Sequence, residues 1–166
     1  MLSRQWTPAP VPPASGQVWA WDVGSIADLP AVRRQLRTRL NADDGLPDAE
    51  SAAAERVILA FDELVSNALR HGRGPVHAQV TASADCFLLD VSDTAVDEPP
   101  TAVDRDPAHG GMGLHLVAAF AGSHGFHLQG VRKHVWAALP VQSQPDPGPV
   151  LSRPQSRHQL RRRLNS

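Results

Sequence analysis

Two polar side chains with the chemistry of phosphoryl transfer stand four residues apart near the middle of the chain. Glu63 offers a carboxylate and Asn67 a carboxamide, and a spacing of four places both on one face of a helix. Both are hard oxygen donors, which bind Mg²⁺ or orient a hydroxyl nucleophile. An exposed polar stripe on an amphipathic helix produces the same pattern. The pair alone therefore leaves both interpretations open.

Helical periodicity places this pair on a long second helix. Apolar residues recur at helical spacing up to His71, and the helix is expected to begin near Asp48 and to end before Gly72 as a C′ glycine. A first helix is expected after Ser25 and Asp28, which fit a capping box. Its arginine-rich face is interpreted as solvated surface, with a partner-binding face as the alternative.

Alternating apolar and polar residues predict strands on both sides of these helices. The predicted strands cover residues 17–23, 76–82, 86–91, 126–129 and 134–139. The second and third of them form a hairpin, which is followed at once by Ser92 and Asp93. The last two are joined by a turn at residues 130–133, which contains Lys133, the only lysine in the chain.

A polar, proline-rich stretch at residues 94–109 separates the hairpin from a third helix. Loops of this length in a small domain usually serve as lids or binding loops. The run Gly110, Gly111, Met112, Gly113 and Leu114 then opens a helix that is expected to end at Gly122. Glycines at a helix start leave the first amides accessible, which favours phosphate binding, although such a run is weak evidence by itself.

Composition narrows the class of protein. The 166 residues suffice for one hydrophobic core, and the formal net charge of -1 argues against nucleic acid or a membrane as the main partner. The single cysteine, Cys86, excludes an internal disulfide, and no apolar run is long enough to span a bilayer. We expect a cytoplasmic protein with a disordered arm at 1–15, a folded domain at 16–140 and a disordered basic tail at 141–166. The tail leaves a nucleic-acid adaptor as a third, weaker reading.

Taken in order, these features resemble the GHKL ATP-binding superfamily, named for gyrase, the heat-shock chaperone, histidine kinases and MutL. Residues 63–72 are similar to its N box, and residues 110–114 are similar to its G2 box. The resemblance covers about residues 17–140 and is strongest to the small stand-alone anti-sigma-factor serine kinases. It implies the Bergerat-type ATP-binding fold, an α/β sandwich with a mixed, mainly antiparallel sheet and helices on one face.

The resemblance also implies roles for individual residues. Asn67 would hold the Mg²⁺ that bridges the nucleotide phosphates, and Glu63 would act as the catalytic base. Asp93 would accept a hydrogen bond from the adenine amino group. The G2 residues Gly111, Gly113 and Leu114 would approach the phosphates of ATP.

One departure from the family pattern follows Asp93. The family usually has glycine at the second and fourth following positions, where this chain has Ala95 and Asp97. A Cβ at Ala95 restricts the backbone if φ is positive there, and the Asp97 carboxylate would repel phosphates if it points inward. The departure predicts either weaker nucleotide affinity or a different geometry of this segment.

The favoured hypothesis is an ATP- and Mg²⁺-dependent serine/threonine kinase of the anti-sigma type, which phosphorylates a separate regulatory protein. That partner would be an anti-anti-sigma-like protein, a sigma factor or both. The alternative is a catalytically inactive module that binds nucleotide or protein and acts by sequestering its partner. A homodimer is a further open alternative.

Overall fold

The computed structural model describes residues 5–42, 51–100 and 113–142. Within these ranges the elements are β1 (Gln17–Val23), η1 (Ile26–Asp28), α1 (Leu29–Asn41), α2 (Ser51–His71), β2 (Val76–Ala82), β3 (Cys86–Asp93), α3 (Gly113–Phe120), β4 (Ser123–Gln129) and β5 (Arg132–Pro140). The expected order of helices and strands is confirmed. The start of α2 near residue 48 and the tail from 143 onward lie outside the described residues.

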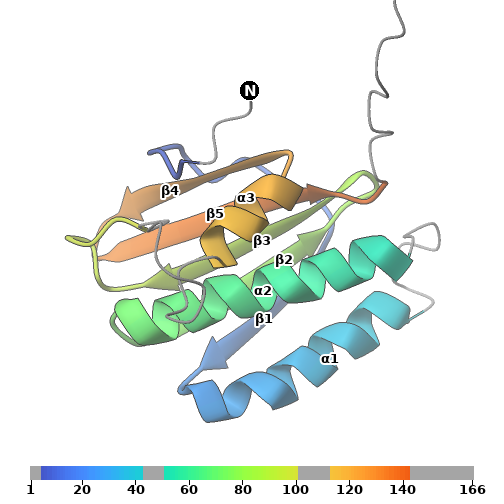
Figure 1. Ribbon diagram of the computed structural model, residues 1–166, viewed down its shortest axis with the longest axis horizontal. Helices are drawn as coiled ribbons and strands as arrows, with labels where there is room; N and C mark the ends of the chain where they lie inside the picture. The colour runs from blue at the N-terminus through green and yellow to red at the C-terminus, as the bar shows by residue number, and fades with distance from the viewer. Residues whose placement is uncertain (1–4, 43–50, 101–112, 143–166) are drawn as a thin grey trace, which may run out of the picture.

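The described strands form one five-stranded sheet in the order β1-β2-β3-β5-β4, with every neighbouring pair antiparallel. All three α-helices lie on one face of this sheet (Figure 1). In β2, Val76, Ala78 and Val80 are buried, whereas His77 and Gln79 are exposed. This alternation assigns one face of the strand to the core beneath the helices. The predicted two-layer fold class is therefore confirmed.

The helices bury apolar stripes against each other and against the sheet. In α1 the buried side chains are Leu29, Val32, Leu36 and Leu40, at the predicted helical spacing. The capping box before it is also confirmed, because the Asp28 carboxylate accepts the Ser25 backbone N–H at 2.9 Å. None of the described helices is long and apolar enough to cross a membrane.

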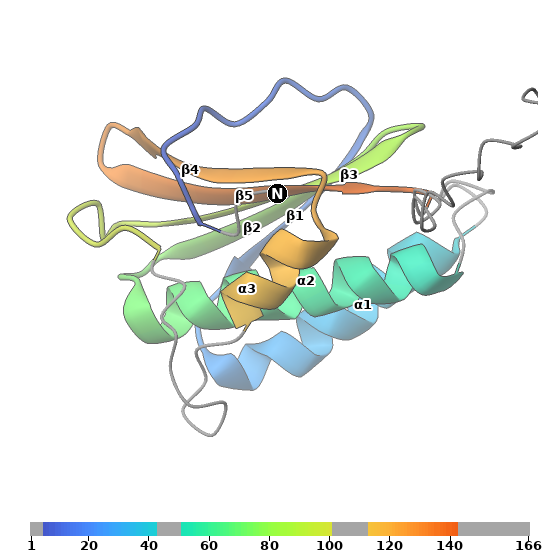
Figure 2. The ribbon, with the colours of Figure 1, turned by 45° about the horizontal axis from the view of Figure 1, so that its top comes forward.

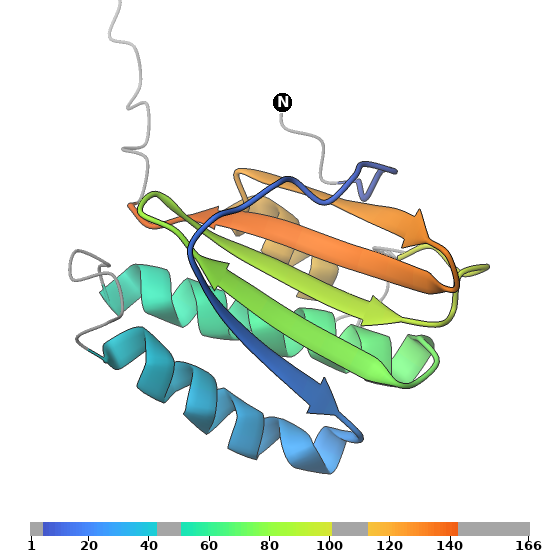
Figure 3. The same cartoon turned by 180° about the vertical axis from the view of Figure 1, so that it is seen from behind.

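The N-terminal segment differs from the expected disordered arm over its described part, residues 5–15. It crosses the sheet face opposite the helices and reaches β4, as Figures 2 and 3 show. There the backbone of Ala9 donates to Phe126 O at 2.9 Å, which extends the sheet past its edge. Trp6 is buried in the core, and its Nε1 donates to the carbonyl of Leu114 at 3.3 Å. The segment thus ties β4 to the first turn of α3.

The last hairpin corrects one prediction. The turn lies at residues 130–131, with Gly130 at φ 60°, so β5 already begins at Arg132. Lys133 is therefore a strand residue directly opposite Asp93 of β3, and not a turn residue. The two polar residues at the start of β5 concealed the strand, because they lack the apolar alternation on which the prediction rested.

Candidate active site

The predicted pair lies on α2 as expected. Glu63 and Asn67 are both half-buried, one helical turn apart. The neighbouring Asp62 serves a different purpose, because its carboxylate pairs with Arg33 of α1 at 2.6 Å. Among residues 5–42, 51–100 and 113–142, neither the Glu63 carboxylate nor the Asn67 amide has a hydrogen-bonding partner. Of these two adjacent carboxylates, Asp62 therefore joins α2 to α1, whereas Glu63 is left for the candidate site.

Glu63 meets the start of α3. A Cβ built on Gly113, the first residue of that helix, would lie 1.8 Å from Glu63 Oε2 and 2.5 Å from its Cδ. Any side chain at position 113 would therefore collide with the carboxylate. The φ of Gly113 is not in the left-handed region, so the glycine serves its close approach to Glu63 and not a special backbone conformation; a Cβ there would force the flexible carboxylate to move. The predicted N-box and G2-box residues Glu63 and Gly113 are brought into contact.

The environment of Glu63 suits a proton acceptor. Burial raises the pKa of its carboxyl, the negative charge of Asp62 raises it further, and Arg70 opposes the shift. A general base works best when its pKa lies closer to the working pH than that of an ordinary glutamate. The raised pKa of Glu63 and its close contact with Gly113 together mark it as a candidate functional group.

Asp93 occupies a contrasting environment at the end of β3. It is 1% exposed, and its Oδ1 accepts the backbone N–H of Ala95 at 2.7 Å. Its Oδ2 lies 3.5 Å from Nζ of Lys133, which is 4% exposed. Gly72 leaves room for this carboxylate, since a Cβ there would lie 2.6 Å from Asp93 Cγ. Asp93 is therefore already paired within its own chain.

Gly72 itself corrects a detail of the prediction. Its φ is not positive, so it does not end α2 through a left-handed C′ conformation. Its N–H continues the helical pattern and donates to Ala68 O at 2.9 Å. A Cβ here would meet the Ala68 carbonyl of the same helix at 2.5 Å as well as Asp93 Cγ at 2.6 Å, so the end of α2 and a distant segment both require the glycine.

Ala95 and Asp97, the two residues that depart from the family pattern, lie in unstrained backbone. No described non-glycine residue has a positive φ, and Ala95 is completely buried. Asp97 is exposed and pairs with Arg73 at 3.4 Å. The segment after Asp93 thus places Ala95 in the interior at the end of β3 and Asp97 at the surface, and the effect on nucleotide affinity stays a prediction.

Of the remaining predicted site residues, only some lie in the described part of the chain. Gly111 lies outside the described residues. The Leu114 side chain is buried in the core, so any contact with phosphate falls to its backbone N–H. His71 is exposed at the end of α2. Sequence reasoning allowed that Trp6 could dock but named no partner for it, and it missed the burial of Lys133, because both depend on partners far away in the chain.

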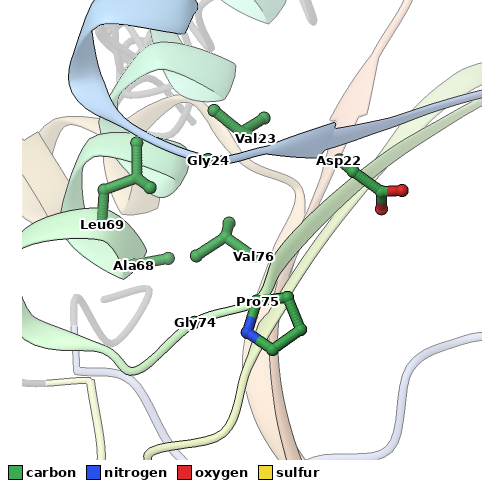
Figure 4. Close-up of a pocket in the computed structure, with 8 residues that line it drawn as sticks. All are labelled: Asp22, Val23, Gly24, Ala68, Leu69, Gly74, Pro75 and Val76. Atoms are coloured by element: carbon green, nitrogen blue, oxygen red, sulfur yellow. The ribbon is translucent and has the colours of Figure 1, made fainter.

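A separate pocket of about 210 Å³ lies between the ends of β1 and α2 and the start of β2 (Figure 4). It is lined by residues that include Val23, Ala68, Leu69 and Val76. Ala68 and Leu69 follow Asn67 by one and two residues, so they point to other faces of α2. This pocket is therefore distinct from the Glu63–Gly113 contact. In the described part of the chain, no three His, Cys, Asp or Glu side chains cluster as a metal site.

The fold is thus an antiparallel sheet backed by helices, in which the Glu63 carboxylate meets the glycine at the start of α3 and Asn67 lies one helical turn further along α2. The sequence matches the family described as histidine kinase-like ATPase domain over residues 24–139. Because the match spans more than half of the chain, the protein belongs to this family.

Two other comparisons add little. No curated protein matches the chain. Among solved structures, the Acinetobacter baumannii histidine kinase AdeS is similar with 14% identity and a TM-score of 0.41, covering 78% of this chain and 70% of that one. The family assignment rests on the sequence match.

Proposed function

We propose that this protein is an ATP-dependent serine/threonine protein kinase of the anti-sigma type, which phosphorylates a separate regulatory protein in the cytoplasm. The observation that carries the proposal is the contact of Glu63 with Gly113, with Asn67 one helical turn away on α2. Its membership of the histidine kinase-like ATPase domain family supports a nucleotide ligand. The partner would be an anti-anti-sigma-like protein or a sigma factor.

The chemistry of the residues fits Mg²⁺ and ATP. Asn67 would hold the Mg²⁺, whose charge would neutralise the phosphate oxygens. Glu63 would accept the proton of the attacking serine or threonine hydroxyl while that oxygen bonds to the γ-phosphorus and ADP leaves. The missing Cβ of Gly113 leaves room for the Glu63 carboxylate beside the first turn of α3, where the phosphates would bind.

The other family-matched residues would bind the nucleotide. Asp93 would accept a hydrogen bond from the adenine amino group, because one of its carboxylate oxygens retains a lone pair. Gly111, Gly113 and Leu114 would present backbone N–H groups to the phosphates at the start of α3. The raised pKa of Glu63 supports the assignment of the base to this residue.

A second candidate is a binding module without catalysis, which acts by sequestering a partner. The observation that favours this second candidate is that Asp93 is paired with Lys133 and with the backbone of Ala95 and is only 1% exposed. The two candidates differ in one measurable respect. Only the kinase transfers phosphate, and that transfer depends on Glu63.

Phosphate transfer to protein tests the proposal. The purified chain is incubated with Mg²⁺ and γ-labelled ATP, together with soluble extract from the source cells, and labelled proteins are identified by mass spectrometry. We expect a labelled serine or threonine with the wild type and none with Glu63→Gln. Glu55→Gln is the matched control, because Glu55 lies exposed on the same helix and pairs with Arg37 at the surface. Equal labelling by wild type and Glu63→Gln would contradict the proposal.

A further inference from the structure

Lys133 is the one residue of the candidate site that the roles above do not use. Among the described residues, Asp93 and Lys133 are the only buried charged side chains. The Lys133 ammonium donates to the carbonyl of Glu98 at 2.7 Å and lies 3.5 Å from Asp93 Oδ2. It therefore links the end of β3 to the backbone five residues further along the chain.

Residues 94–98, the cover segment, are held against the protein at several points. The N–H of Ala95 donates to Asp93 Oδ1 at 2.7 Å, and the N–H of Thr94 donates to Arg73 O at 2.8 Å. Within the segment, the N–H of Glu98 donates to Ala95 O at 3.3 Å. Ala95 is fully buried and Asp93 is 1% exposed, so the carboxylate is closed to solvent, and the cover segment contacts it through the Ala95 amide.

Two cations contact this segment, and their surroundings differ. Arg73 reaches Asp97 at 3.4 Å and Glu98 at 3.8 Å, but all three side chains are more than half exposed. Water and salt screen such pairs, so they contribute little. Lys133 acts in a buried site, where a charge-assisted hydrogen bond is stronger and its loss is more costly. Of these two cations, Lys133 is therefore the stronger anchor of the cover segment.

We propose that Lys133 holds the cover segment closed over Asp93, and that the segment must be released before Asp93 receives a ligand's hydrogen-bond donor. The inference deepens the proposed function and rests on it for the identity of the ligand, a purine nucleotide with an exocyclic amino group. A protein whose binding-competent state is a minor population binds with an affinity reduced by that population. Lys133 is thus a positioning residue that sets the nucleotide affinity.

Hydrogen exchange of the cover segment tests the closure without any ligand. The amides of Ala95, Val96 and Glu98 are compared in wild type, Lys133→Met and Arg73→Met by NMR or mass spectrometry. We expect exchange about tenfold faster or more in Lys133→Met, and close to wild-type exchange in the Arg73→Met control. Unchanged exchange in a folded Lys133→Met protein would overturn the inference.

A second variant guards against loss of the fold, because Lys133→Met leaves the buried Asp93 charge unpaired. In Asp93→Asn/Lys133→Met no charge remains buried, and the amide oxygen of residue 93 still accepts the Ala95 N–H. We expect this double variant to fold with the same rapid exchange of residues 95–98, since the anchor to Glu98 is missing. Wild-type exchange rates in the double variant would also overturn the inference.

Calorimetric titration with a non-hydrolysable ATP analogue and Mg²⁺ completes the test. We expect Lys133→Met to bind several-fold more tightly than wild type, because the cost of opening is removed. Weaker binding together with faster exchange would overturn the inference, since Lys133 would then support the ligand directly. Absence of binding by both proteins would overturn the proposed function, whereas the exchange rates would still decide whether Lys133 closes the segment.

Discussion

The two halves of the candidate site differ in how far the protein has satisfied its own polar groups. At the α2–α3 contact, Glu63 is half-buried, has a raised pKa and has no hydrogen-bonding partner among the described residues. At the end of β3, Asp93 is buried and is paired with Lys133 and with the backbone of Ala95. Both are carboxylates in the same small domain.

The difference separates two tasks. A catalytic group must keep its reactive atoms available, and this costs stability because a charge is partly desolvated without compensation. A recognition group is stabilised by partners until a ligand replaces them. Under the proposed function, chemistry and ligand entry would be controlled separately, by Glu63 in one half and by Lys133 in the other.

The largest expected effect comes from the unpaired half. Glu63→Gln keeps the shape of the side chain but removes its ability to accept a proton. We expect phosphate transfer to protein to fall by about 10²–10⁴-fold, the usual contribution of a general base. Calorimetry should show nucleotide affinity within a few-fold of wild type. A transfer rate that survives the substitution would show that the two halves do not divide the tasks in this way.

A smaller effect is expected where Glu63 meets α3. Gly113→Ala places a Cβ where Glu63 Oε2 now lies, and the flexible carboxylate must swing away. We expect a loss of about 1 kcal/mol in the free energy of unfolding and at least a tenfold loss of transfer activity, because displaced catalytic groups work poorly.

A double-mutant cycle isolates that contact. In a Glu63→Ala background the collision is absent, so Gly113→Ala should cost almost nothing in denaturant unfolding. An equal cost in both backgrounds would mean that the glycine is needed for the helix itself and not for Glu63.

The smallest effect is a dependence of stability on pH. Burial raises the pKa of Glu63 above its ordinary 4.5 in the folded protein, so the folded state binds this proton more readily than the unfolded chain. The stability that this carboxyl group contributes is therefore fully present below its pKa in the unfolded chain, and it is lost as the pH rises through its pKa in the folded protein. Glu63→Gln should raise the Tm slightly at about pH 8 and leave it unchanged at about pH 4. A lower Tm at the higher pH would contradict the raised pKa.

Local patterns in the sequence predicted most of the fold. The apolar spacing of α1, the capping box at Ser25 and the hairpin formed by residues 76–93 are encoded within a few residues of one another. Each of these features is confirmed. The fold class could also be predicted, because the order of these elements matches that of a known family.

What could not be predicted depends on contacts between distant segments. Lys133 has a polar neighbour on each side and appeared to be a turn residue, and only its register opposite Asp93 explains its burial. Trp6 lies in a proline-rich arm, yet it finds the carbonyl of Leu114 more than one hundred residues away. Gly72 leaves room for Asp93, a long-range contact, as well as for the Ala68 carbonyl of its own helix.

The most direct test of the account is the Mg²⁺ dependence of ATP-analogue binding in the wild type and in Asn67→Ala, measured by isothermal titration calorimetry. Asn67 stands beside Glu63 on the open half of the site and is the proposed Mg²⁺ ligand. We expect the wild type to bind at least about tenfold more tightly with Mg²⁺ than without it, and Asn67→Ala to lose that gain. The same Mg²⁺ dependence in both proteins, or no binding by the wild type at millimolar ligand, would contradict the nucleotide site at its centre.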